Sequence, residues 1–167
     1  IKTLGGNLMK KLLIALLAMA CVWTVGCAKK EEAPAETQEE TTEVANPMKE
    51  ATVEDINNLV GIEIKMPEGA EVTAAYIISD KVGEVRFTLD GKDYTYRAAK
   101  GDEEDISGLY YDWKQNDDIH VNGHLGKLMG AEGIANANWY DAENKINYSL
   151  NSETAGTELI MEVAPQL

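Results

Sequence analysis

The chain has 167 residues, a formal net charge of −14 and a sequence pI of about 4.5. A protein this acidic has no electrostatic attraction for nucleic acid or for an anionic lipid surface, so partners of these two classes are not expected. Its two cysteines, Cys21 and Cys27, both lie near the N-terminus, so disulfides do not hold the rest of the chain together.

An apolar segment with a basic start precedes Cys27. Lys10 and Lys11 stand before residues 12–25, which carry no charge. A helix of this length would extend about 21 Å, which is shorter than the roughly 30 Å hydrocarbon core of a bilayer. The pattern therefore predicts a secretion signal over residues 9–26 and not a membrane span. Residues 1–8 match no part of such a signal, and we expect translation to start at Met9.

The residues around Cys27 resemble the lipobox of bacterial lipoproteins. Val25-Gly26-Cys27 matches this motif, whereas Thr24 departs from the usual Leu or Val. The resemblance implies that Cys27 becomes an acylated N-terminus at the outer face of the cell membrane, because two acyl chains anchor a protein stably. Cys21 is a rival acylation site, and an ordinary signal cleaved near Ala28 is the alternative.

Residues 27–50 are predicted to form a disordered acidic tether. They are rich in Thr and Glu and contain no aromatic residue, so they cannot bury enough surface to offset the entropy of ordering. Loss of the three lysines that precede Cys27 would change the net charge from −14 to −17, because no acidic residue is lost with them. We expect one folded domain over residues 51–167, with its first ordered residues near Asn46-Pro47.

A helix is predicted near each end of this domain. Thr52 is a good N-cap, Asp55 stands at the capping-box position three residues later, and Gly61 suits the C-terminal end. Apolar residues recur at helical spacing between these caps. Near the C-terminus, residues 152–163 fit a helix or a strand, and we predict a helix.

The rest of the domain carries strand and hairpin signals. Asp90-Gly91 and Asn122-Gly123 each predict a two-residue type I′ turn, and residues 141–144 predict a third hairpin. In the strand before Asp90, Glu84 and the other polar residues are expected to face solvent. The strands expected are residues 62–65, 72–79, 84–89, 94–98, 109–114, 119–121, 124–125, 134–140 and 145–150. Together these elements predict an α+β fold: a curved antiparallel sheet in a meander of hairpins, with an N-terminal and a C-terminal helix.

One sequence pattern resembles a known group of proteins. Tyr96-Arg97-Ala98-Ala99-Lys100-Gly101, followed by Asp105-Ile106-Ser107-Gly108, is similar to a motif of small uncharacterised lipoproteins of Gram-positive anaerobes. These proteins pair a lipobox and an acidic tether with one β-rich domain of unknown function. The chain departs from their pattern at Leu109-Tyr110-Tyr111, where Asp-Tyr-Asn is commoner. The resemblance implies a location and a fold, and no known activity.

Two groups of side chains are weak candidates for binding a metal ion. His120 and His124 flank a predicted turn, but zinc sites normally use three or four protein ligands, so we expect surface histidines. Residues 102–105 are four consecutive acids, but calcium loops space their ligands at alternate positions, so we expect a solvated loop. No serine lies in a Gly-x-Ser-x-Gly or Ser-x-x-Lys pattern and no phosphate-binding glycine loop is present, so no catalytic residue and no cofactor is assigned.

Strand alternation assigns the aromatic residues to faces. Trp113 is predicted to face opposite to Tyr110, and Trp139 opposite to Tyr140. The neighbours of the two tryptophans are mostly apolar, whereas the two tyrosines have polar neighbours. We therefore predict Trp113 and Trp139 as core residues and Tyr110 and Tyr140 as candidate ligand contacts; the alternative is that the tyrosines are half-buried rim residues.

These features predict a lipid-anchored extracytoplasmic protein with a non-catalytic binding or interaction domain. Besides the membrane reached through the lipid, its partner is expected to be a peptide, a wall component or another envelope protein. The alternative is a small extracytoplasmic hydrolase or metal-dependent enzyme that uses the region of His120 and His124.

The acylation of Cys27 is directly testable. Cys27→Ala removes the thiol that would carry the lipid, so we expect the variant to remain an unprocessed precursor and to take up no alkyne fatty acid, whereas the wild type is labelled. Cys21→Ala is the matched control and should label like the wild type. An unlabelled wild type, or equal labelling of wild type and Cys27→Ala, would contradict the lipoprotein prediction.

Overall fold

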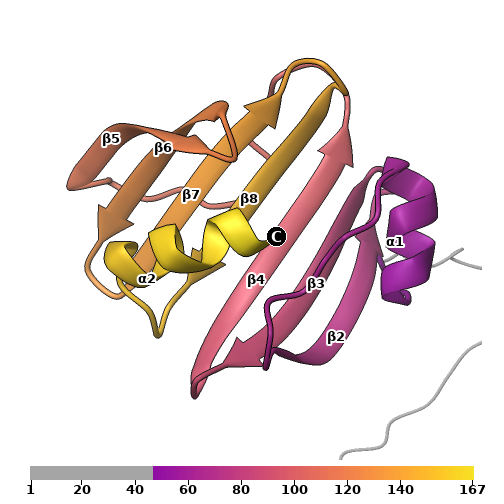
Figure 1. Ribbon diagram of the computed structural model, residues 1–167, viewed down its shortest axis with the longest axis horizontal. Helices are drawn as coiled ribbons and strands as arrows, with labels where there is room; N and C mark the ends of the chain where they lie inside the picture. Colours follow the sequence, from indigo (N-terminus) through magenta and orange to yellow (C-terminus); the bar gives the residue numbers. More distant parts are fainter. Residues whose placement is uncertain (1–46) are drawn as a thin grey trace, which may run out of the picture. The chain divides into compact units, whose positions relative to one another are not determined.

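Eight antiparallel strands form one curved sheet in the computed structural model, which describes residues 47–167 (Figure 1). The strands are β1 (Met48–Glu50), β2 (Glu71–Ile78), β3 (Val82–Leu89), β4 (Lys92–Lys100), β5 (Gln115–Val121), β6 (His124–Ala131), β7 (Ile134–Asp141) and β8 (Ile146–Ser152). Their order in the sheet is β1-β2-β3-β4-β8-β7-β6-β5. The predictions for the secretion signal, for Cys27 and for most of the tether concern residues 1–46, which lie outside the described residues.

The sheet consists of two four-stranded meanders that meet at its centre. Strands β1 to β4 pair consecutively, strands β5 to β8 do the same, and β4 pairs with β8. Helix α1 (Val53–Val60) follows β1, and helix α2 (Thr157–Val163) with the 3-10 turn η1 (Ala164–Gln166) follows β8. The predicted α+β class is confirmed. The predicted curved antiparallel sheet of hairpins is also confirmed, and its hairpins form two meanders because three strands separate β4 from β5 in the sheet.

The N-terminal helix begins where its capping signal predicted. The Asp55 N–H donates to Thr52 Oγ1 at 3.1 Å, and the Thr52 N–H donates to Asp55 Oδ2 at 2.8 Å. Gly61 ends the helix at a φ of 80°, and its N–H donates to the Asn57 carbonyl. A helix of eight residues is marginal by itself in water, so α1 also depends on packing its buried residues, Ile56 and Val60, against the sheet.

Both predicted type I′ turns are confirmed by their backbone angles. The φ values are 50° and 72° at Asp90 and Gly91, and 51° and 87° at Asn122 and Gly123. Positive φ at both central residues gives the twist that a two-residue hairpin needs. Such a turn also fixes which residues face each other along the whole hairpin.

Two predicted strands are absent, and their residues instead cross the sheet as extended chain. Residues 62–65 help to close the apolar core, with Ile64 buried, and residues 109–114 lie on the opposite face. Alternation of apolar and polar residues describes any segment with one buried side, so it does not by itself identify a strand that has a partner.

Three element boundaries also differ from the predictions. Residues 48–50, which we assigned to the tether, form β1 and pair with β2. The strand predicted at residues 124–125 continues to Ala131 as β6. The C-terminal helix predicted over residues 152–163 is present, but it begins only at Thr157, because Ser152 still belongs to β8.

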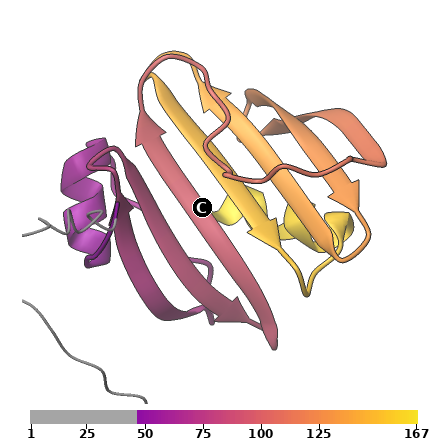
Figure 2. The same ribbon diagram turned by 180° about the vertical axis from the view of Figure 1, so that it is seen from behind.

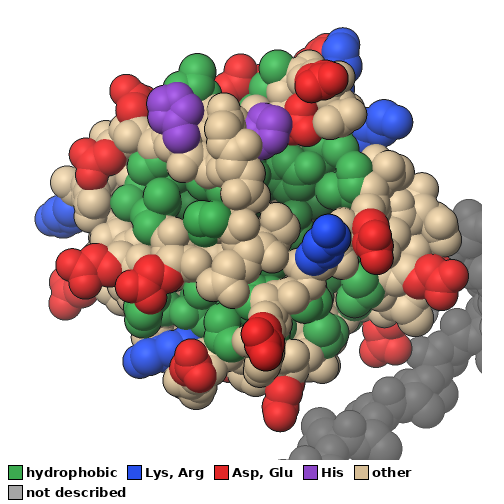
Figure 3. Space-filling model, viewed as in Figure 1, with side chains coloured by type: hydrophobic (Ala, Val, Ile, Leu, Met, Phe, Trp, Pro, Cys, Tyr) green, Lys and Arg blue, Asp and Glu red, His purple; other side chains and the backbone are tan. Residues whose placement is uncertain are grey.

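One face of the sheet is apolar and lies beneath both helices; we call it the helix face. The strand register aligns a row of residues across this face: Ile77, Gly83, Ala98, Tyr148 and Trp139. Side chains of α1 and α2 join them in one buried cluster that includes Ile56, Ile160 and Val163. Acidic side chains lie around the rim of this side of the molecule (Figure 3).

Gly83 allows α1 to approach the sheet closely. A Cβ at this position would collide with the Cγ2 of Ile56, which is fully buried. We expect Gly83→Ala to lower the free energy of unfolding by about 1–3 kcal/mol, because the helix must move away from β3. Chemical denaturation of the two single variants and of the double variant with Ile56→Ala measures this contact.

The double variant should lose less stability than the sum of the two single losses, because Ile56→Ala removes the atom that collides. Gly156→Ala is the matched control, since a Cβ there meets nothing within 4 Å and the φ of −78° suits any residue. Equal losses of stability in Gly83→Ala and Gly156→Ala would show that the close approach of α1 to β3 does not require a glycine at position 83.

Candidate functional site

The face opposite the helices is polar and is crossed by the chain itself. Residues 101–114, which we call the strap, leave the end of β4, pass over β8, β7 and β6 and reach the start of β5 at the edge of the sheet (Figure 2). The Lys114 N–H donates to the Gly130 carbonyl of β6 at 2.9 Å, where the strap ends. We call this side of the sheet the strap face.

A continuous row of polar residues, one from each strand, crosses the strap face. In sheet order, the register aligns Glu50, Tyr76, Glu84, Arg97, Ser149, Asn138, Lys127 and Asp118. The row contains one buried ion pair, between Glu84 and Arg97, and one exposed ion pair, between Lys127 and Asp118. The strap lies over the middle of this row.

Glu84 is the buried charge at the centre of the strap face. It is 0% exposed, so the prediction that it faces solvent was wrong. Its Oε2 accepts from Arg97 Nε at 2.7 Å and lies 2.7 Å from Arg97 Nη2, and its Oε1 has the same two contacts with Arg86. Arg86 in turn lies 5.0 Å from the centre of the Tyr76 ring. A buried carboxylate needs this full set of partners because it has lost its hydration.

Arg97 also fastens the strap. Its Nη1 donates to the carbonyl oxygens of Ile106 at 3.1 Å and Ser107 at 2.6 Å. Gly108 follows at a φ of 66°, and a Cβ there would lie against the Arg97 guanidinium. The two halves of the sequence motif that we singled out therefore meet in space: its arginine holds the backbone of its Asp-Ile-Ser-Gly segment.

Two asparagines of neighbouring strands hold the first half of the strap. Asn147 of β8 donates from Nδ2 to the Asp102 carbonyl at 2.9 Å and accepts from the Glu104 N–H at 2.8 Å. Asn138 of β7 donates from Nδ2 to Asp105 Oδ1 at 2.9 Å. Asn147 and Arg97 thus bind the strap backbone and Asn138 binds the Asp105 carboxylate, so these three side chains are not free to act on a ligand.

A groove lies between the strap and the outer strands of this face. It has a volume of about 440 Å³ and is lined by residues from the strap, β6, β7 and β8: Glu103, Glu104, Asp105, Leu125, Gly126, Lys127, Met129, Asn138, Trp139, Tyr140 and Asn147. Small-molecule and side-chain sites in proteins are commonly of this size. Of the residues that the sequence predicted as ligand contacts, Tyr140 lines this groove.

Most of the exposed large apolar side chains lie on the strap face. In the described part of the chain, four large apolar side chains are classed as exposed, and three of them are Tyr110 (97%), Tyr111 (45%) and Leu125 (67%) on this side. The fourth is Val72 (44%) on β2. Groups of exposed apolar side chains on a soluble domain commonly mark a binding surface.

The two tryptophans predicted as core residues differ. Trp139 is 5% exposed and stacks on Tyr148 of the helix face with ring centres 5.3 Å apart, which confirms its prediction. Trp113 is only half-buried on the strap, where its ring lies 5.3 Å from that of Tyr111. The core prediction for Trp113 was wrong because residues 109–114 cross the sheet and do not form a strand within it.

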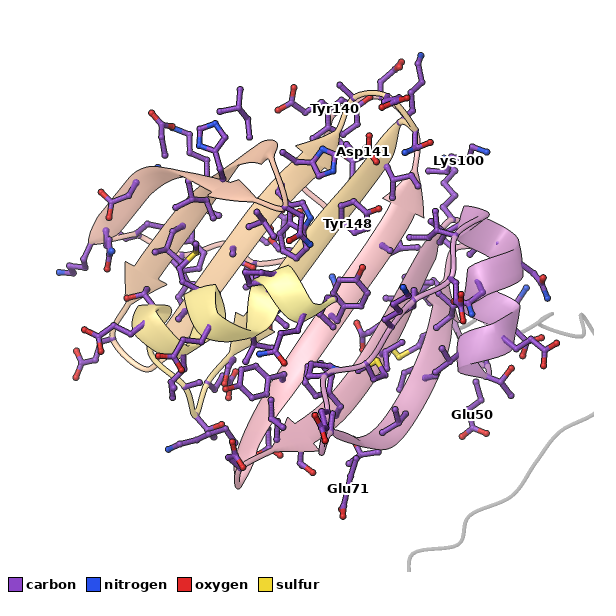
Figure 4. All side chains as sticks on the ribbon, in the orientation of Figure 1. Glu50, Glu71, Lys100, Tyr140, Asp141 and Tyr148 are labelled. Carbon is purple, nitrogen blue, oxygen red and sulfur yellow. The ribbon has the colours of Figure 1, made fainter. Side chains whose placement is uncertain are left out.

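Tyr140 and Asp141 lie together at the end of β7 (Figure 4). Tyr140 is half-buried, and its hydroxyl donates to the Gly101 carbonyl at 3.3 Å, so it braces the start of the strap as well as lining the groove. Burial would raise the pKa of Asp141, but hydrogen bonds from the side chain and backbone of Asn144, with smaller effects from His124 and the Glu143 N–H, lower it below its ordinary value. Asp141 therefore stays ionised and organises the β7–β8 turn.

The two histidines do not come together. His120 pairs with Leu125 and His124 pairs with Val121, so they alternate between the two faces of the β5–β6 hairpin. His124 Nε2 lies 3.8 Å from Asp141 Oδ2. No group of three or more His, Cys, Asp or Glu side chains within residues 47–167 is arranged to hold a metal ion.

The acidic segment of residues 102–105 is the exposed wall of the groove. Lys145 Nζ contacts Asp102 Oδ1 at 3.1 Å, and the Ser107 N–H donates to Asp105 Oδ1 at 2.8 Å. The expectation of a solvated loop agrees with the exposure of residues 102–105, and the bond from Ser107 shows that Asp105 caps a turn. Glu103 and Glu104 project from the strap as exposed carboxylates.

A second cavity, of about 530 Å³, lies at the other end of the sheet, between the β6–β7 turn and the start of α2. Its charged lining residues, Lys114, Glu132 and Glu153, are all exposed. It contains none of the residues singled out from the sequence, so the groove beside the strap is the stronger candidate site.

Sequence reasoning missed Glu84 and the asparagines of the strap face. The pairing of Glu84 with Arg97 could have been predicted from the sequence, because a two-residue turn at Asp90-Gly91 places residue 84 opposite Arg97. The contacts of Asn138 and Asn147 could not be predicted from a local sequence pattern, because their partners lie 33 and 43 residues away along the chain.

Comparison with protein families, with curated proteins and with solved structures gives no match. Within the described residues, neither helix has the length and apolar character needed to cross a bilayer.

The fastening of the strap can be tested at Arg97. Arg97→Leu leaves Glu84 buried with one arginine and frees two strap carbonyls, so we expect a loss of about 3–5 kcal/mol in the free energy of unfolding. The double variant Glu84→Leu/Arg97→Leu should recover part of this loss, because no buried charge then lacks its partner. Urea denaturation measures all three proteins.

Lys127→Leu provides the control from the same polar row. Its partner Asp118 is exposed, and an exposed ion pair contributes at most about 1 kcal/mol. If Arg97→Leu is no more destabilising than Lys127→Leu, the strap is not held by the buried pair.

Proposed function

We propose that this protein is a lipid-anchored, non-catalytic binding protein of the outer face of the cell membrane, and that the strap face is its contact surface. The anchoring rests on the lipobox at Cys27, on the acidic segment that follows it and on the resemblance to small lipoproteins. The observation that carries the binding function is the exposure of Tyr110, Tyr111 and Leu125 on the strap face, where Leu125 lines a groove of about 440 Å³.

The segment that carries Tyr110 and Tyr111 is held against the sheet. Arg97, Asn138 and Asn147 hold the strap before Tyr110, and the bond from the Lys114 N–H to the Gly130 carbonyl holds it after Tyr111. Ordering a flexible loop on binding costs free energy, and a loop that is already fastened avoids most of that cost. This supports a surface prepared for contact with a partner.

The polar groups of the strap face support binding and not catalysis. Within the described residues, no buried side-chain nitrogen or oxygen lacks a hydrogen-bond partner. The buried carboxylate of Glu84 binds the partly buried guanidinium of Arg97, and Arg97 also binds the strap backbone. We therefore assign them a structural role, with a peptide, a wall component or another envelope protein as the partner of the surface above them.

Site-specific crosslinking in living cells tests this function. A photoreactive phenylalanine analogue at Tyr110 or at Leu125 should give the same adduct, because both positions belong to one surface. The matched control is Val72, which is also an exposed apolar residue but lies on β2. Leu125→Asp should abolish the adduct formed from position 110, because it places a charge within the apolar contact.

Identical adducts at all three positions would indicate nonspecific crowding at the membrane and would contradict the assignment of the strap face. An adduct at position 110 that survives Leu125→Asp would show that the groove is not part of the contact.

A further inference from the structure

We infer that the groove beside the strap binds an extended peptide segment in which Lys or Arg alternates with apolar residues. The inference rests on the proposed function, because it names the ligand class of the strap face. It comes from the charges that line the groove and from the spacing of the side chains on its floor.

The free charges of the groove are negative. Among its lining residues, Lys127 is the single cation, and its ammonium is paired with Asp118 of β5. Glu103 and Glu104 face the groove as exposed carboxylates with no ion pair in the described part of the chain. A cationic group that enters the groove therefore meets unneutralised carboxylates, whereas an anionic group is repelled.

Leu125 is the exposed apolar side chain on the floor of the groove, whereas Met129 beyond Lys127 on the same strand is buried. Leu125, Lys127 and Met129 are alternate residues of β6, so their side chains point to the same side. Leu125 is 67% exposed and has apolar area to bury against a ligand. An extended peptide repeats its side chains at the same two-residue period, so its apolar groups can follow β6 while its cationic groups reach the strap.

The free carboxylates and the exposed leucine of the groove together favour one class of ligand over the others. A wall polymer that carries phosphate or carboxylate groups is disfavoured by the carboxylates of Glu103 and Glu104. A polyamine could neutralise the carboxylates of Glu103 and Glu104 but has no side chain that would cover Leu125. A basic and apolar segment of another protein satisfies both requirements.

The probes for calorimetric titration are two synthetic hexapeptides, acetyl-(Leu-Lys)₃-amide and acetyl-(Leu-Glu)₃-amide, added to the purified full-length protein. We expect the lysine peptide to bind and the glutamate peptide not to bind. The affinity should fall as salt is raised, because exposed charges are screened.

Two sets of variants locate the binding. Glu103→Gln/Glu104→Gln keeps the size of both side chains and should weaken the lysine peptide about two- to fivefold for each charge removed. Leu125→Ala should weaken it about tenfold. Glu158→Gln/Glu162→Gln is the matched control: it removes two exposed carboxylates from α2, on the other side of the sheet, and should leave the affinity unchanged.

Equal effects of the two glutamine pairs would mean that the peptide responds only to the net charge of the protein, and would overturn the inference. Spermidine that binds with the same dependence on Glu103 and Glu104, while Leu125→Ala changes neither ligand, would overturn the peptide assignment. If neither hexapeptide binds but the crosslink from position 110 depends on Leu125, the ligand class is wrong and the proposed function stands. If that crosslink is also absent, both the ligand class and the proposed function are wrong.

Discussion

The burial of the Glu84 carboxylate determines how the strap face is built. An ionised carboxylate without solvent is stable only with several donors, and here Arg86 and Arg97 supply four contacts of 2.7 Å. Once Arg97 is held in this way, its remaining nitrogen points to the strap and binds the carbonyls of Ile106 and Ser107. This contact fixes the middle of the strap, while Asn147 and Asn138 hold the segment that forms the wall of the groove.

The two faces of the sheet are stabilised by different interactions. On the helix face, apolar residues and Gly83 let α1 and α2 pack closely, and this side supplies the hydrophobic core. On the strap face, side chains hydrogen-bond to the backbone of a segment that has no strand partner over most of its length. The second arrangement leaves apolar side chains such as Leu125 exposed, which is a property of a binding surface.

The elements that the sequence predicted well are those governed by local chemistry. Thr52 with Asp55 predicted the start of α1, and Asp90-Gly91 predicted a type I′ turn. The opposition of Glu84 and Arg97 follows from that turn but was not predicted. Residues 109–114 of the strap were predicted as a strand because their apolar and polar residues alternate, but this segment crosses the sheet and has no strand partner. The fastening of the strap joins Asn138 to Asp105 and Asn147 to Glu104 across 33 and 43 residues, and no local pattern contains such a contact.

Hydrogen exchange of the strap amides tests the central claim most directly, because it reports whether the strap is fastened over the sheet in solution. The N–H groups of Glu104, Ser107 and Lys114 donate to Asn147, Asp105 and Gly130, whereas the N–H of Tyr110 has no such partner in the described structure. The account predicts slow exchange at residues 104, 107 and 114 and fast exchange at residue 110. Uniformly fast exchange over residues 102–114 would contradict it.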